Sequence, residues 1–137
     1  MLKVGIVGAT GAVGRNMVEV LENSKVEISE IRLFASERSS GQVMKFRGME
    51  VLVERLTPDA MKEGFDYLLF SAGSDVSKEF APIAAEAGTV VIDNSSAFRM
   101  VPEIPLVVPE INGHLLKNYQ GIVANPNCST IQMVLAL

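Results

Sequence analysis

The chain has only one cysteine in 137 residues, and charge of neither sign is concentrated in any part of it. One cysteine cannot form an intramolecular disulfide, so we expect a single domain whose core is closed by packing, without disulfides or a metal. The lone thiol is consistent with a reducing compartment, and we expect a cytoplasmic protein. The 12 Lys and Arg residues are scattered and are outnumbered by 16 Asp and Glu, so we expect no nucleic-acid or membrane partner. No apolar run is long enough to span a membrane, and the start of the chain does not resemble a signal peptide.

Short apolar runs alternate along the chain with segments of helical periodicity. Strands are predicted over 3–7, 30–35, 66–71, 89–92, 106–108 and 121–124, and an antiparallel hairpin over 44–46 and 50–53. Helices are predicted over 13–23, 59–63 and 76–87. In the first of these helices, one face carries Val13, Met17, Val20 and Leu21. This alternation predicts an α/β fold, a doubly wound and mostly parallel sheet with helices on both faces.

The first predicted strand runs directly into a turn with three glycines, Gly8-Ala9-Thr10-Gly11-Ala12-Val13-Gly14. Strand, glycine turn and helix in this order are the context that a dinucleotide-binding turn requires. Gly8 allows the tight turn, Gly11 lets the backbone approach a pyrophosphate, and Gly14 permits close contact between helix and strand. The spacing is G-x-x-G-x-x-G, not the commoner G-x-G-x-x-G, and a glycine turn without a ligand is the alternative.

The loop after the second strand bears on which dinucleotide is bound. A site for NAD usually has an acidic residue here to hold the ribose 2′-hydroxyl. This chain instead has Ser36-Glu37-Arg38-Ser39, in which Arg38 and the two serines suit a 2′-phosphate. Glu37 would repel that phosphate if it pointed inward. An ordinary polar loop is the alternative, but together with the glycine turn the loop favours NADP.

Two later strands also end in residues suited to a ligand. Small residues, Ser71, Ala72 and Gly73, follow one strand and would let a ligand lie against the backbone at the carboxyl edge of the sheet. The polar run 93–99 follows the next and ends in Arg99, which could reach into the same crevice. From the sequence alone, a solvated or structurally paired arginine is the favoured interpretation of Arg99.

The only cysteine, Cys128, lies where the last predicted strand passes into an apolar segment with good helix formers. Pro126 disfavours helix before it, which would place Cys128 in the first helical turn. Unpaired N–H groups and the helix dipole there lower the pKa of a thiol and favour a nucleophilic thiolate. A buried, inert cysteine is the favoured alternative when this segment is considered alone. His114 could be imagined as its base, but a surface histidine is the better interpretation.

Six segments, in order and in register over the whole chain, resemble aspartate-β-semialdehyde dehydrogenases. They are Gly8–Gly14, Ser36-Glu-Arg-Ser-Ser-Gly41, Phe70-Ser-Ala-Gly73, Asp93-Asn-Ser-Ser-Ala-Phe-Arg99, Val107-Val-Pro-Glu-Ile-Asn112 and Asn125-Pro-Asn-Cys-Ser-Thr130. The resemblance implies a Rossmann-like domain and the NADPH-dependent reductive dephosphorylation of aspartyl-β-phosphate, an acyl phosphate, with release of inorganic phosphate. It implies that Cys128 is the catalytic nucleophile and forms an acyl-thioester, and that Arg99 and Asn127 bind the substrate phosphate.

The resemblance also assigns cofactor contacts and a wider architecture. The predicted cofactor-binding residues are Gly8, Thr10, Gly11, Ala12, Val13, Gly14, Ser36, Arg38, Ser39, Ser71, Ala72, Gly73 and Asn94. In the family a second domain follows and carries the acid–base histidine and most of the dimer interface. We therefore expect 1–137 to be the N-terminal NADP-binding domain of a homodimer or homotetramer, with little or no turnover alone. The alternatives are an inactive NADP-binding module, an N-acetyl-γ-glutamyl-phosphate reductase and a malonyl-CoA reductase.

Overall fold

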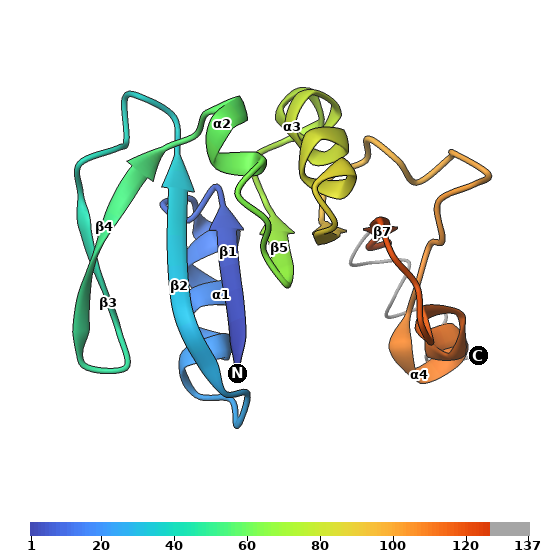
Figure 1. Ribbon diagram of the computed structural model, residues 1–137, viewed down its shortest axis with the longest axis horizontal. Coiled ribbons are helices and arrows are strands. Elements are labelled where there is room, and N and C mark those ends of the chain that lie inside the picture. Colours follow the sequence, from blue (N-terminus) through green and yellow to red (C-terminus); the bar gives the residue numbers. More distant parts are fainter. Residues whose placement is uncertain (127–137) are drawn as a thin grey trace.

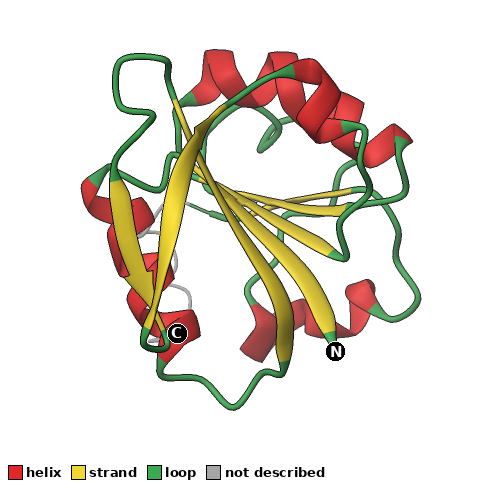
Figure 2. Cartoon of the chain, turned by 60° about the vertical axis from the view of Figure 1, so that its left-hand side comes forward, coloured by secondary structure: helices red, strands yellow, loops and turns green. Residues whose placement is uncertain are grey.

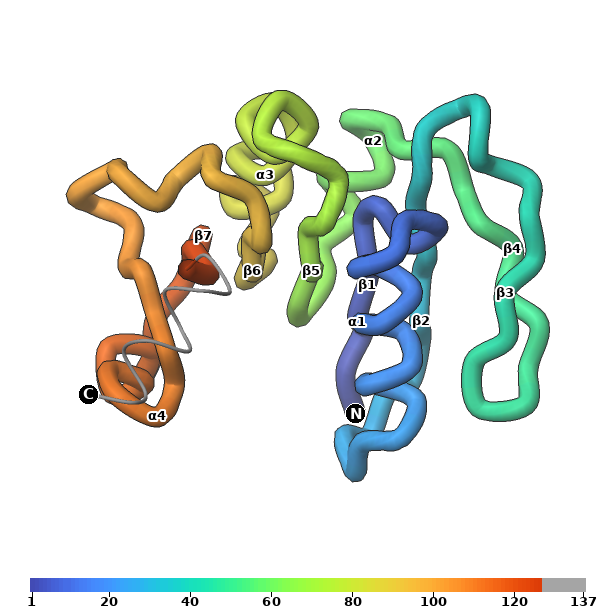
Figure 3. The backbone as a smooth tube through the Cα atoms, turned by 180° about the vertical axis from the view of Figure 1, so that it is seen from behind, coloured from blue at the N-terminus to red at the C-terminus, as the bar shows by residue number. Residues whose placement is uncertain are grey.

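The computed structural model describes residues 1–126, and these form one sheet with helices on both faces (Figure 1). The strands are β1 (Leu2–Val7), β2 (Ile28–Ala35), β3 (Val43–Phe46), β4 (Met49–Arg55), β5 (Tyr67–Phe70), β6 (Val90–Asp93) and β7 (Ile122–Ala124). Their order across the sheet is β3-β4-β2-β1-β5-β6-β7. All neighbouring pairs are parallel except β3 and β4, which form an antiparallel hairpin at one edge (Figure 3). The predicted mostly parallel sheet is confirmed.

Helices lie on both sides of this twisted sheet, as Figure 2 shows. They are α1 (Ala12–Glu22), α2 (Pro58–Met61), α3 (Ser74–Glu86) and α4 (Pro109–Asn112), followed by the 3₁₀ helix η1 (Gly113–Leu116). Adjacent residues of β1 belong to different cores: Ile6 packs with Val18 of α1, whereas Val7 packs with Met61 of α2 and Ala84 of α3. Because side chains alternate along a strand, the sheet separates two apolar layers, as in a doubly wound fold.

The buried face of α1 differs from the predicted one. Met17 and Leu21 pack against the core as expected, but Val13 and Val20 are exposed, and Gly14 and Val18 are the buried positions. Gly14 lies against the turn after β1, where a Cβ would collide with the Gly8 carbonyl, so the side of α1 that carries Gly14 and Val18 is the one that faces the sheet.

Residues 106–108 do not form the predicted strand. Within residues 1–126, only Leu106 makes a bridge, to Ala124, and the hydrogen bonds between the two segments run from the Val107 N–H to the Ala124 carbonyl and from the Ala124 N–H to the Pro105 carbonyl. Proline limits the pairing, because Pro109 begins α4 directly afterwards. The predicted short helix at 59–63 is found as α2, which begins one residue earlier and ends two residues earlier. Thr57 caps it by accepting a hydrogen bond from the Ala60 N–H at 3.1 Å.

Candidate functional site

The carboxyl ends of the central strands meet at one edge of the sheet. The register aligns the last residue of β1, Val7, with Phe34 near the end of β2 and with Phe70 at the end of β5, and Phe70 with Asp93 at the end of β6. The loops that follow these strands therefore start side by side. In open α/β sheets this is the edge at which ligands bind.

The glycine turn after β1 is built by close backbone contacts. Gly8 has φ of 86°, and a Cβ there would collide with the Ser71 carbonyl. A Cβ at Gly14 would collide with the Gly8 carbonyl, so both positions require glycine. At Gly11, the N-cap of α1, a Cβ would meet only the Gly8 oxygen, at 3.6 Å. The N-terminus of α1 is therefore open beside Gly11, and this cradle fits an anionic pyrophosphate.

An open cleft of about 490 Å³ lies over this turn. It brings together six of the predicted cofactor residues, Gly8, Thr10, Gly11, Ser36, Ser71 and Ala72. The other seven, Ala12, Val13, Gly14, Arg38, Ser39, Gly73 and Asn94, are not among its described lining residues. The cleft also includes residues for which the sequence analysis predicted no binding role: Glu37, Arg55, Leu56, Val76 and Phe80 among them.

The polar loop after β2 is folded back on itself. The N–H groups of Ser39 and Ser40 donate to the Ser36 carbonyl, and the Ser40 hydroxyl donates to the Glu37 carbonyl. The Glu37 carboxylate lies 3.8 Å from Nη2 of Arg55, at the end of β4. Arg38 is exposed beside them. A cation at position 55 could have been recognised in the sequence only with the knowledge that β4 lies next to β2.

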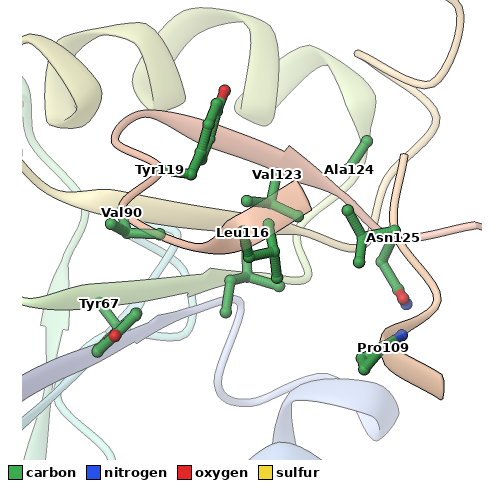
Figure 4. A pocket seen from close by; sticks show the side chains of 10 residues that line it. Tyr67, Val90, Pro109, Leu116, Tyr119, Val123, Ala124 and Asn125 are labelled. Carbon is green, nitrogen blue, oxygen red and sulfur yellow. The ribbon is translucent and has the colours of Figure 1, made fainter. Parts of the chain in front are cut away.

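A second cluster links the ends of β6 and β7. Arg99 donates from Nε to the Asn125 carbonyl at 2.8 Å and from Nη2 to the Asn94 carbonyl at 3.2 Å. The Asn125 side chain, labelled in Figure 4, donates from Nδ2 to Oδ1 of Asn94 at 2.6 Å. Arg99 is thus structurally paired, as the sequence alone favoured, but two bonds leave further N–H donors on a guanidinium that has five. Its phosphate-binding role stays a prediction.

Asp93, the last residue of β6, is fully buried and anchors this cluster to α3. Its carboxylate accepts hydrogen bonds from the Ser77 hydroxyl at 2.7 Å and from the Ser95 hydroxyl and N–H at 2.8 and 3.0 Å. Ser77 lies in the first helical turn after Gly73. The carboxylate therefore ties the first turn of α3 to the loop after β6, and sequence patterns gave no sign of this connection.

The predicted nucleophile Cys128 and the predicted phosphate ligand Asn127 lie outside the described residues. The last two described residues before them are Asn125, whose carbonyl accepts a hydrogen bond from Arg99, and the buried Pro126. His114 is exposed in η1, which agrees with the surface histidine preferred from the sequence.

A separate, apolar pocket of about 220 Å³ lies beside β5, β6 and β7 (Figure 4). Its lining includes Tyr67, Val90, Leu116, Tyr119 and Val123. It lacks the glycine turn and the open helix N-terminus that a phosphate group requires, so the cleft over Gly8–Gly11 is the better candidate site.

Within residues 1–126, no helix is long and apolar enough to cross a membrane. The same part of the chain contains no group of three or more His, Cys, Asp or Glu residues that could hold a metal ion.

A parallel sheet with a glycine turn and an open cleft at its carboxyl edge defines a dinucleotide-binding α/β domain. The family described as "Semialdehyde dehydrogenase, NAD binding domain" matches residues 3–119. The chain belongs to the semialdehyde dehydrogenase family.

Relatives with high sequence identity carry a more specific name. The chain is 55% identical over 137 residues to the aspartate-semialdehyde dehydrogenase of Aquifex aeolicus and 51% identical over 136 residues to that of Bacillus subtilis. These alignments cover 98% and 99% of this chain but 40% and 39% of the relatives. The chain thus spans about two fifths of the length of the curated relatives that it matches.

Solved structures show the same relationship. The aspartate-semialdehyde dehydrogenase II of Vibrio cholerae, complexed with ASA, superposes with a TM-score of 0.94 at 49% identity, over all of this chain and 45% of that one. The Candida albicans enzyme, solved with NADP, superposes with a TM-score of 0.81 at 26% identity, over 98% of this chain and 45% of that one.

Proposed function

We propose that the protein carrying this chain is an NADP-dependent oxidoreductase that reductively dephosphorylates aspartyl-β-phosphate to aspartate-β-semialdehyde. The observation that carries this proposal is the open cleft over the glycine turn, where Gly8 and Gly14 are required by backbone contacts and Gly11 leaves an open helix N-terminus. The names of the relatives support the substrate. We further propose that 1–137 is the N-terminal domain, which binds the cofactor and carries the nucleophile; the chain's coverage of about two fifths of those relatives supports this.

The proposed chemistry uses residues around the ends of β6 and β7. The Cys128 thiolate attacks the acyl phosphate, forming an acyl-thioester as the bond to phosphate breaks and inorganic phosphate leaves. A nicotinamide cofactor held in the cleft over Gly8–Gly11 would supply the hydride that reduces the thioester, and the Cys128 thiolate would leave as the aldehyde forms. Asn127 and the remaining N–H groups of Arg99 bind the phosphate, because charge-assisted bonds favour a dianion. The acid–base group comes from outside 1–137.

NADP is proposed over NAD because of the loop after β2. Ser36 lines the cleft, and Arg38 and Ser39 follow it directly. Position 37 is acidic, but its carboxylate lies beside Arg55, which lowers its repulsion of a phosphate. We further propose a cytoplasmic homodimer or homotetramer whose partners are the acyl phosphate and inorganic phosphate.

Calorimetric titration of the purified protein with NADP and with NAD tests the cofactor assignment. We expect tighter binding of NADP, weakened by about 1–3 kcal/mol in Arg38→Ala through loss of a charge-assisted hydrogen bond, with little effect on NAD. Lys45→Ala, on the hairpin away from the cleft lining, is the matched control. Binding of neither nucleotide by a folded protein would refute the assignment.

An activity assay tests whether residues 1–137 alone are only a binding module. Phosphate-dependent reduction of NADP with aspartate-β-semialdehyde measures the reaction in its reverse direction. We expect turnover from a protein that includes the acid–base domain and little or none from 1–137 alone. Turnover by 1–137 alone would contradict this expectation, and turnover by the longer protein that persists in Cys128→Ser would refute the thioester mechanism.

A further inference from the structure

Arg55 lies on the wall of the cleft next to the loop expected to hold the ribose. It ends β4, where its backbone pairs with Ala35 of β2, and the next residue, Leu56, donates its N–H to the Ala35 carbonyl at 2.9 Å. Arg55, Ser36 and Glu37 all line the cleft. The end of the second strand is where a Rossmann-type site holds the adenosine ribose. Arg55 is therefore a cation at the ribose end of the cleft, away from the open N-terminus of α1.

The partner of Arg55 in the structure holds it only weakly. Nη2 of Arg55 lies 3.8 Å from the Glu37 carboxylate, near the limit of an ion pair, and the two side chains are 61% and 77% exposed. Exposed pairs of this kind contribute little, because water screens them and two long side chains must be ordered. A phosphate dianion offers a guanidinium two charge-assisted hydrogen bonds in a geometry that matches its fork. Breaking the Arg55–Glu37 contact to bind a phosphate would thus cost little free energy.

We infer that Arg55 determines specificity for the 2′-phosphate of the dinucleotide by moving from Glu37 to that phosphate when NADP binds. With NAD, which has a 2′-hydroxyl there, Arg55 stays with Glu37 and adds no affinity. The pair also accounts for an acidic residue in a site for an anion, since Arg55 compensates the Glu37 charge until the phosphate arrives. The inference rests on the proposed function, since it assumes a dinucleotide in this cleft.

A purely structural Arg55, which held the 36–41 loop through Glu37, would behave differently. Replacing either Arg55 or Glu37 would then disturb the loop to the same extent and weaken the binding of both NADP and NAD. If Arg55 determines specificity, the two substitutions have different effects on NADP binding, because Arg55 attracts the phosphate whereas Glu37 competes with the phosphate for Arg55. Glu37→Gln should therefore leave NADP binding unchanged or tighten it, while Arg55→Ala weakens it.

The test titrates the purified protein and its variants with NADP and NAD by calorimetry at two salt concentrations. We expect Arg55→Ala to weaken NADP by about 5- to 50-fold and NAD by less than about 2-fold, the size of a lost charge-assisted contact. Arg55→Lys should recover part of the loss, since it keeps the charge but not the fork. The difference in NADP affinity between the unaltered protein and Arg55→Ala should shrink at high salt, because salt screens the attraction between Arg55 and the phosphate. Lys45→Ala controls for the change of net charge, and circular dichroism checks that each variant is folded.

The outcomes separate the inference from the proposed function. NADP binding that is unchanged in Arg55→Ala, or an equal loss for NADP and NAD, overturns the inference and leaves the proposed function standing. Binding of neither nucleotide by the unaltered, folded protein overturns the proposed function and the inference with it. A selective loss of NADP binding supports both.

Discussion

Replacing Asp93 with alanine should be among the most damaging single changes in the described part of the chain. The carboxylate is fully buried and accepts three hydrogen bonds, from the Ser77 hydroxyl and from the hydroxyl and N–H of Ser95. Alanine removes every acceptor at once. The hydroxyl groups of the two buried serines would then lack an acceptor at the point where α3 and the end of β6 are joined.

The size of the loss follows from these contacts. A hydrogen bond to a charged group contributes about 1.5–3 kcal/mol, so three of them would sum to about 4.5–9 kcal/mol. The sum overestimates the effect, because alanine also removes the cost of burying a carboxylate away from water. Each buried serine hydroxyl left without its acceptor costs about 1–3 kcal/mol, so we expect Asp93→Ala to cost about 2–5 kcal/mol. Ser77→Ala breaks only one of the bonds and should cost about 1–3 kcal/mol.

Urea unfolding followed by circular dichroism measures these changes. The double variant Asp93→Ala/Ser77→Ala should be little less stable than Asp93→Ala, giving a coupling energy of about 1–3 kcal/mol. Ser96→Ala, an exposed neighbour, is the control and should change stability by less than about 0.5 kcal/mol. A cost below about 1 kcal/mol for Asp93→Ala, or costs that simply add in the double variant, would refute this reasoning.

Two further changes test the glycine turn and the ion pair between Arg32 of β2 and Glu63. Gly14→Ala should destabilise the fold by about 1–3 kcal/mol, because its Cβ would overlap the Gly8 carbonyl, while Gly11→Ala should cost less than about 1 kcal/mol. Thermal unfolding compares the two, and equal losses would contradict the contact argument. Arg32, 3.1 Å from the Glu63 carboxylate, lowers the pKa of Glu63 from its ordinary value of 4.5. A lowered pKa means that the pair stabilises above about pH 4.5 and that this contribution, at most about 1 kcal/mol for so exposed a group, is lost as the pH falls below it. The stability difference between the unaltered protein and Glu63→Gln should therefore shrink in acid, and a difference that grew would contradict the assignment.

The sequence by itself determined the features that depend on short stretches of chain. Apolar runs and helical periodicity lie within single elements, so the alternation that predicts a doubly wound sheet is visible without any long-range contact. The turn between β1 and α1 is equally local. The positive φ at Gly8 and the requirement for small residues depend on a few neighbouring positions of the sequence. The glycine turn predicts a nicotinamide dinucleotide, which the family match supports, while the preference for NADP drawn from the serines and arginine after β2 stays a prediction.

Tertiary structure decided what depends on which strands are neighbours. Arg55 follows Glu37 by eighteen positions, and only the pairing of β4 with β2 places it on the cleft wall. Asp93 meets Ser77 because α3 packs across the end of β6, and no periodicity marks that meeting. The wrongly predicted strand at 106–108 has the same origin: a ladder needs a partner along its length, and within residues 1–126 the pairing of this segment with β7 is limited to Ala124, just before Pro109 begins α4. Local propensity selects the elements, but hydrogen bonding and charge pairing between distant elements set the chemistry of the cleft.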